Sequence, residues 1–195
     1  GYTFAGWDKE IPATMPAENV TITAQWTINQ YTITFDTVGG TAIDPIAQDF
    51  GTAVAAPAAP TKTGYTFAGW DKEIPATMPA ENVTITAQWT INQYTITFNT
   101  LGGTEIAAIT QDYATAIVAP AAPTKEGHTF AGWDKEIPAT MPAENVTITV
   151  KEWIVNSYTV KFLDAEDAVL ESSELDFGTA ISAPAINPTK VHYEF

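Results

Sequence analysis

Carboxylates are the residues of this 195-residue chain whose type and spacing come closest to a chemical site. Asp8 and Glu10 flank Lys9, and an extended strand would place both carboxylates on one face, where they could hold Ca²⁺ or a sugar. A denser cluster consists of Asp164, Glu166, Asp167 and Glu171. That cluster lacks the residue spacing of a calcium-binding loop. We favour a solvated acidic surface in both places, with weak calcium binding across 164–171 as the alternative.

Nucleophilic and metal chemistry have few other candidates. His128 stands where the related segments have tyrosine, and His192 lies near the end; neither has a ligand partner at zinc-site spacing. None of the four serines lies in a Gly-x-Ser-x-Gly context. The chain has no cysteine, which excludes disulfides, thiolate metal sites and cysteine nucleophiles. We therefore predict no enzyme activity, no catalytic residue, no metal ligand and no cofactor.

The charge balance restricts the partners. Eight lysines and no arginine oppose 23 acidic residues, for a net charge of −15. Nucleic acids and anionic lipid surfaces both select basic proteins, so we expect neither as a partner. No apolar run approaches the roughly 20 residues that a bilayer-spanning helix needs, which predicts no direct membrane contact. The chain has no initiator methionine and no leader pattern, which indicates a fragment or mature segment.

A repeat organises everything else. The motif Gly-Tyr-Thr-Phe-Ala-Gly-Trp begins at Gly1 and Gly64, and returns at Gly127 with His128 in the tyrosine place, a period of 63 residues. Residues 1–35 and 64–98 are identical. Such periodicity indicates an array of equivalent small units. A unit this small is marginally stable alone and needs its largest side chains in its core.

Each period is predicted to form a set of short strands. Alternating apolar and polar residues predict strands at 2–7, 20–26 and 31–35, and Gly6 permits a bulge or a close approach before Trp7. Gly39-Gly40 predicts a tight hairpin turn into a weaker edge strand over 43–50, which contains Pro45. Closely spaced prolines in 53–60 exclude a long helix. In the third copy Glu166-Asp167 replaces the glycine pair, so we expect a different or longer turn there.

The aromatic residues at these positions are the predicted core. This set comprises Trp7, Trp26, Tyr31, Phe35, Trp70, Trp89, Tyr94, Phe98, Trp133, Trp153, Tyr158 and Phe162. The tryptophans could alternatively form an exposed platform on which sugars stack. We favour the core because a 63-residue unit has few other large side chains with which to build one.

Five elements recur in order through the chain, and together they resemble a known family. One set comprises Tyr94–Phe98, Gly102–Gly103, Ala119–Lys125, Gly127–Trp133 and Met141–Trp153. The pattern is similar to the Listeria–Bacteroides repeat, or internalin B-repeat, family. The resemblance implies β-grasp-like small α+β modules that are mainly β, arranged in tandem in large, extracellular bacterial surface proteins.

In the frame of that family the chain divides into four parts. Residues 1–30 are the C-terminal part of a repeat, 31–93 and 94–157 are complete repeats, and 158–195 are the N-terminal part of another. Glu166-Asp167 and His192, which stands where other copies have glycine, depart from the pattern. Partial repeats expose strand edges, so self-association through the terminal half-repeats into a head-to-tail filament is one alternative.

The sequence thus predicts a structural role at the bacterial cell surface. Only four residues, 27–30 and again 90–93, separate a closing tryptophan from the next opening tyrosine, which predicts a semi-rigid, elongated rod whose units contact their neighbours. We expect a stalk or spacer segment of an adhesin-like protein. The alternative is a repeat binding module that engages a host glycoprotein or polysaccharide by avidity.

Overall fold

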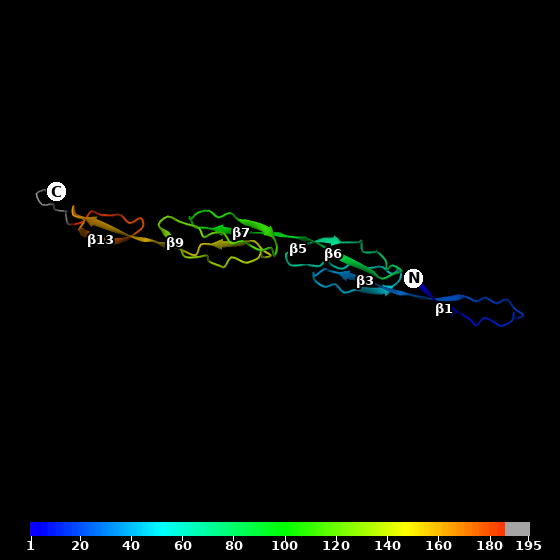
Figure 1. Cartoon of the computed structure of the whole chain (residues 1–195). Coiled ribbons are helices and arrows are strands. Elements are labelled where there is room, and N and C mark those ends of the chain that lie inside the picture. The colour runs from blue at the N-terminus through cyan, green and yellow to red at the C-terminus, as the bar shows by residue number, and fades with distance from the viewer. Residues whose placement is uncertain (186–195) are drawn as a thin grey trace. The chain divides into compact units, whose positions relative to one another are not determined.

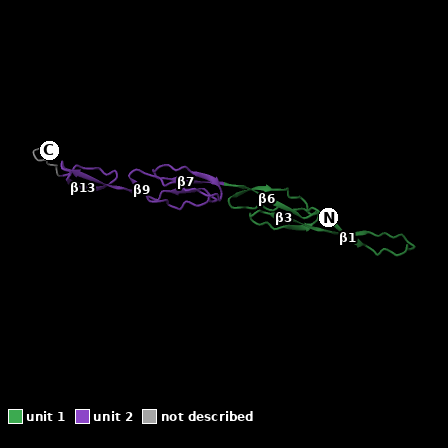
Figure 2. Cartoon of the chain, in the orientation of Figure 1, with its two compact units in different colours: residues 1–92 green, residues 93–195 purple. Residues whose placement is uncertain are grey.

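The computed structural model describes residues 1–185 of the chain. The chain forms two compact units, Gly1–Asn92 and Gln93–Phe195 (Figure 2). Each unit is built of short strands joined by long loops (Figure 1). Residues 1–185 contain no helix, and so none that could span a bilayer. The mainly β prediction is confirmed.

Unit 1 contains one complete four-stranded sheet. Its strands are β3 (Gln30–Asp36), β4 (Ile46–Asp49), β5 (Tyr65–Trp70) and β6 (Val83–Ile91), in the order β4-β3-β6-β5. The central pair is parallel, with Ile33 opposite Val83 and Phe35 opposite Ile85, and both outer pairs are antiparallel. Alternation therefore places one face of β3 and β6 in the core and leaves threonine-rich positions on the other.

The glycine in the predicted strand at 2–7 has the expected effect. β1 (Tyr2–Trp7) pairs antiparallel with β2 (Ala24–Ile28), and the register shifts between Phe4 and Gly6. Gly6 adopts φ +126°, and Gly69 repeats this in β5 with φ +119°. A side chain is disfavoured at such φ values, so the bulge depends on glycine.

The predicted strand at 20–26 forms fully only where it has a parallel partner. Its counterpart β6 begins at Val83, because Val83 to Thr86 pair with β3. In residues 1–30 the strand β2 begins at Ala24, four residues later than predicted. The letters are identical, so tertiary pairing decides the difference.

Unit 2 contains the second complete repeat with a divided sheet. Its strands are β7 (Gln93–Asn99), β8 (Ile109–Asp112), β9 (His128–Phe130), β10 (Val146–Thr149) and β11 (Trp153–Val155). The sheets are β10-β7-β8 and β11-β9. Val150-Lys151-Glu152 has one residue more than Ala87-Gln88, and the long strand of repeat 1 is interrupted at this insertion.

The third copy differs in its turn. β12 (Ser157–Leu163) pairs with β13 (Val169–Asp176) up to Leu163 opposite Val169, whereas the ladder of β3 and β4 ends at Ile33 opposite Ile46. The turn is therefore different but tighter, not longer. Asp167 adopts φ +63°, and the Asp164 carboxylate accepts the backbone N–H groups of Glu166 (2.9 Å) and Ala168 (2.8 Å). These bonds stabilise a tight turn without glycine.

Candidate functional site

Each complete repeat encloses its own buried cluster. In repeat 1 the cluster is Ile33, Phe35, Met78 and Ile85, and in repeat 2 it is Ile96, Phe98, Met141 and Ile148. The two methionines come from the proline-rich loop and are 1% exposed. Met78 is held by its backbone, which donates to the Thr52 carbonyl and accepts from the Gly51 N–H. This loop therefore closes the open side of the sheet.

A second feature of each complete repeat is a tryptophan seated on the hairpin loop. The indole N–H of Trp89 donates to the Thr37 carbonyl at 2.9 Å, and Trp153 donates to the Thr100 carbonyl at 2.9 Å. A Cβ added at Gly40 would lie 2.6 Å from Cζ2 of Trp89, and one added at Gly103 would lie 2.4 Å from the same atom of Trp153. The second glycine of the pair is thus needed for space beneath the indole ring.

A lysine covers this tryptophan site in repeat 1. Lys62 Nζ donates to the Val38 carbonyl at 2.8 Å and lies 4.5 Å from the ring centroid of Tyr65. Val38 has φ +49°, so the lysine contacts the strained part of the turn. In repeat 2 Lys125 Nζ lies 5.8 Å from the centroid of Trp153. These contacts place both lysines in structural roles.

The predicted core residues fall into three groups. Phe35 and Phe98 are buried. The half-buried members are Tyr31, Trp70, Trp89, Tyr94, Trp133, Trp153 and Phe162. The placement in the core is wrong for Trp7, Trp26 and Tyr158, which are 49%, 60% and 55% exposed.

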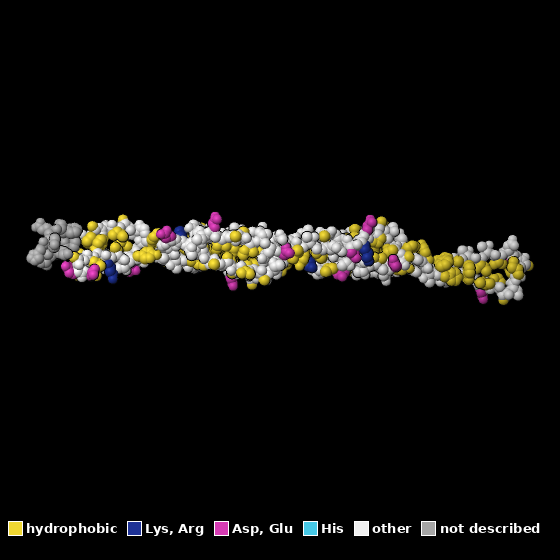
Figure 3. Space-filling model, turned by 45° about the horizontal axis from the view of Figure 1, so that its top comes forward, with side chains coloured by type: hydrophobic (Ala, Val, Ile, Leu, Met, Phe, Trp, Pro, Cys, Tyr) yellow, Lys and Arg dark blue, Asp and Glu magenta, His cyan; other side chains and the backbone are white. Residues whose placement is uncertain are grey.

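The exposure of Trp26 has a physical cause. Trp26 matches Trp89 letter for letter, but no residue of the sequence corresponds to the Thr37 loop on which Trp89 is seated. Hydrophobic side chains accordingly gather over β1 and β2 at the right end of Figure 3. Trp89 and Trp153 are therefore half-buried by the hairpin before them, and their local sequence alone does not cover them.

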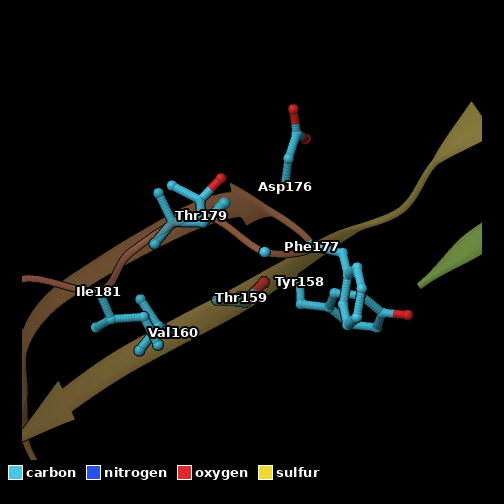
Figure 4. Close-up of a pocket in the computed structure, with 9 residues that line it drawn as sticks. Tyr158, Thr159, Val160, Asp176, Phe177, Thr179 and Ile181 are labelled. Atoms are coloured by element: carbon cyan, nitrogen blue, oxygen red, sulfur yellow. The ribbon is translucent and has the colours of Figure 1, made fainter. Parts of the chain in front are cut away.

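Tyr158 borders an open cavity of about 270 Å³ in unit 2. Figure 4 shows Val160 and Ile181 on one side of this cavity and Asp176 directed away from it. In repeat 1 the matching residue Tyr31 packs against the cluster that contains Met78. The cavity therefore occupies the place that the buried cluster has in repeat 1, and Asp176 is the one charged residue among the described residues that line it.

Asp8, a candidate site carboxylate, and its counterparts in the other two copies hydrogen-bond to the backbone instead. Asp8 accepts the N–H of Thr23 at 2.7 Å, and Asp71 and Asp134 make the same bond to Thr86 and Thr149. Glu10 is exposed. Among residues 1–185, no three His, Asp or Glu side chains are gathered closely enough to hold a metal ion. Figure 3 shows acidic side chains scattered singly on the visible face.

Within residues 1–185, His128 makes contacts inside unit 2. His128 makes a 2.7 Å hydrogen bond between Nδ1 and the Glu126 carbonyl, and its ring lies 6.0 Å from that of Phe177. His192 lies outside the described residues. Met78 and Met141, which are buried in the two clusters, were not identified from the sequence. Nor were Asn29 and Asn156, which make hydrogen bonds at the strand connections. An identical residue in each period was the available signal, but recent duplication masks it.

Comparisons with known proteins identify a family and several relatives. A family model described as the Listeria-Bacteroides repeat domain matches residues 31–90 and 94–152. Internalin H of Listeria monocytogenes is 37% identical over 155 residues, covering 67% of this chain and 27% of the relative. A putative membrane protein of Evansella cellulosilytica is 32% identical over 191 residues, covering 90% of this chain and 29% of the relative.

A putative Gly-rich membrane protein of the same Evansella species is 30% identical, covering all of this chain and 27% of the relative. The chain therefore spans less than a third of the length of each of these relatives. Among solved structures, domains 3-4 of the Streptococcal High Identity Repeats in Tandem from a cell surface protein are 19% identical, with a TM-score of 0.23. That match covers 65% of this chain and 98% of the other.

Proposed function

Because this chain belongs to the Listeria-Bacteroides repeat domain family, we propose that it is a run of structural spacer repeats from an extracellular bacterial surface protein. In this proposal residues 31–93 and 94–157 are whole repeats, and the flanking segments are parts of further repeats. The array holds a functional tip away from the cell envelope, as the stalk of an adhesin does.

One observation carries the proposal: each complete repeat closes a core of its own around a methionine that is 1% exposed. Such repeats can be added or removed without opening a core, and stability is then a sum of repeat and neighbour terms. The polar groups that could have supported chemistry are bonded within the repeat, as the Asp71 carboxylate is to the Thr86 N–H. The surface location is supported by the relatives, an internalin and two putative membrane proteins.

The test is a display experiment in which only the number of repeats changes. An epitope is fused at one end of the chain and a cell-wall anchor at the other, with one to six 63-residue periods between them. We expect binding of an antibody-coated bead to the epitope to rise with the number of periods. A glycine–serine linker of equal residue number is the control, and it should place the epitope closer to the wall. Bead binding that is independent of repeat number would contradict the spacer function.

A further inference from the structure

Consecutive repeats are joined in the structure by a single residue that bonds to both of them. In unit 1 β2 ends at Ile28 and β3 begins at Gln30, so Asn29 alone connects them. The Asn29 N–H donates to the Gly1 carbonyl at 2.9 Å, and the Asn29 carbonyl accepts the N–H of Phe50 at 2.9 Å. Its side-chain oxygen accepts the Thr3 hydroxyl at 2.7 Å. The connection is therefore shorter than the four residues expected, and it is fully bonded.

The same junction contains an aromatic contact across the two repeats. Phe50 comes from the loop after β4, in the later repeat, and its ring meets that of Tyr2 edge-on at 5.9 Å. A Cβ added at Gly1 would lie 2.1 Å from the Phe50 ring. The ring is thus seated directly on the glycine backbone, and no side chain fits between them.

Unit 2 repeats this arrangement at its own junction. Asn156 donates to the Gly127 carbonyl and accepts the N–H of Phe177, each at 2.8 Å. Its side-chain oxygen accepts the Thr129 hydroxyl at 2.6 Å. The Phe177 ring meets His128 at 6.0 Å, and a Cβ on Gly127 would lie 2.1 Å from that ring. The contact thus keeps its geometry when the first ring changes from tyrosine to histidine.

The sequence of the third copy supports a role for this contact. Residues 163–175 differ from residues 36–48 at every position. The run Asp-Phe-Gly-Thr-Ala that follows is nevertheless the same at 49–53 and 176–180. Phe177 is 43% exposed, so the core of its own repeat does not explain why the aromatic residue is kept.

We propose that the glycine of the Gly-Tyr/His-Thr-Phe strand and the phenylalanine of the next repeat, Gly1 with Phe50 and Gly127 with Phe177, form a dedicated repeat–repeat interface. Its partner is the following repeat of the same chain, recognised by an aromatic ring on a bare glycine backbone and fixed by the asparagine bonds. The interface removes the hinge that a connection would otherwise provide. This inference deepens the proposed function, because a spacer keeps its reach only if its junctions resist bending.

The test measures the distance between two spin labels placed on either side of the unit 2 junction. The chain lacks cysteine, so Lys135→Cys and Glu174→Cys, both at exposed positions, give a unique label pair. Glu105→Cys with Lys135→Cys, within one repeat, is the control pair for internal rigidity. We expect the junction distribution of the otherwise unchanged chain to be as narrow as that of the control pair.

Two variants disrupt the interface, one in each of its two partners. Phe177→Ala removes the ring, and Gly127→Ala places a methyl group where the ring sits; each should broaden the junction distribution while the control pair stays narrow. Phe177→Tyr should leave it narrow, because copy 2 already has Tyr113 at this position. An unchanged distribution in both disruptive variants, or a broad one before any change, would overturn the interface.

The outcome is separable from that of the display experiment. A narrow distribution of the junction distance, together with bead binding that is independent of repeat number, would remove the spacer function and leave the interface standing. A broad junction distribution together with bead binding that rises with repeat number would remove the interface and leave the spacer function standing.

Discussion

At the scale of single residues, the fold depends on side chains that enter one repeat from distant parts of its own sequence. Met78 lies 45 positions after Ile33, and both are buried in the same cluster. Met15 occupies the identical sequence context, but it is 79% exposed. The difference between the two is their surroundings alone, which makes them a matched pair.

We predict that Met78→Ala lowers the free energy of unfolding of repeat 1 by about 2–5 kcal/mol, because it removes a buried side chain and leaves a cavity. Met15→Ala should change it by less than about 0.5 kcal/mol, as exposed substitutions generally do. Urea titrations followed by tryptophan fluorescence measure both. Equal effects of the two substitutions would show that the cluster around Met78 is not the core.

The two glycines of the hairpin are needed for different reasons: Gly39 for its backbone conformation and Gly40 for the space beneath the Trp89 ring. Gly39→Ala should cost about 1 kcal/mol, because Gly39 has φ +81° but no atom closer than 3.9 Å to an added Cβ. Gly40→Ala should instead displace the Trp89 ring, whose Cζ2 would lie 2.6 Å from the new Cβ. We expect a red-shifted Trp emission for Gly40→Ala only. Identical spectra for both variants would contradict the assignment of Gly40 to the tryptophan site.

At the scale of elements, the hairpin of β12 and β13 shows how a turn forms without glycine. The Asp164 carboxylate holds two backbone N–H groups of this turn. Asp164→Ala should therefore destabilise the hairpin by about 1 kcal/mol for each bond that is lost. Amide hydrogen exchange across residues 157–176 measures the loss of stability, and we expect faster exchange at Glu166 and Ala168. Glu166→Ala, which keeps the Asp164 side chain, is the control and should leave the exchange rates unchanged.

The strands also show which features of the fold could be predicted from the sequence and which could not. Alternation located the strands at 2–7 and 31–35, and Gly6 located the bulge, because these signals are local. The late start of β2 at Ala24 could not be predicted, since the same letters form the longer β6 beside a parallel partner. Trp26 and Trp89 likewise share their neighbours in sequence and differ in what covers them. Long-range pairing, not local preference, decides such positions.

At the scale of the whole molecule, we propose that the repeats act as additive spacers. Deleting residues 31–93 joins Gln30 to Tyr94, which restores the Gln-Tyr sequence of every junction but the last and leaves 132 of the 195 residues. A compact chain of 195 residues has a radius of gyration of about 16 Å, and the deletion would reduce that by only about 14%. An array extended repeat by repeat has a larger radius and loses roughly a third of it, in proportion to the residues removed.

Small-angle X-ray scattering of the 195-residue chain and of the deletion variant therefore tests the spacer function. We predict a radius of gyration well above about 16 Å for the whole chain, and a fall to about two thirds of that value on deletion. A radius near the compact value, with only a slight fall on deletion, would contradict it.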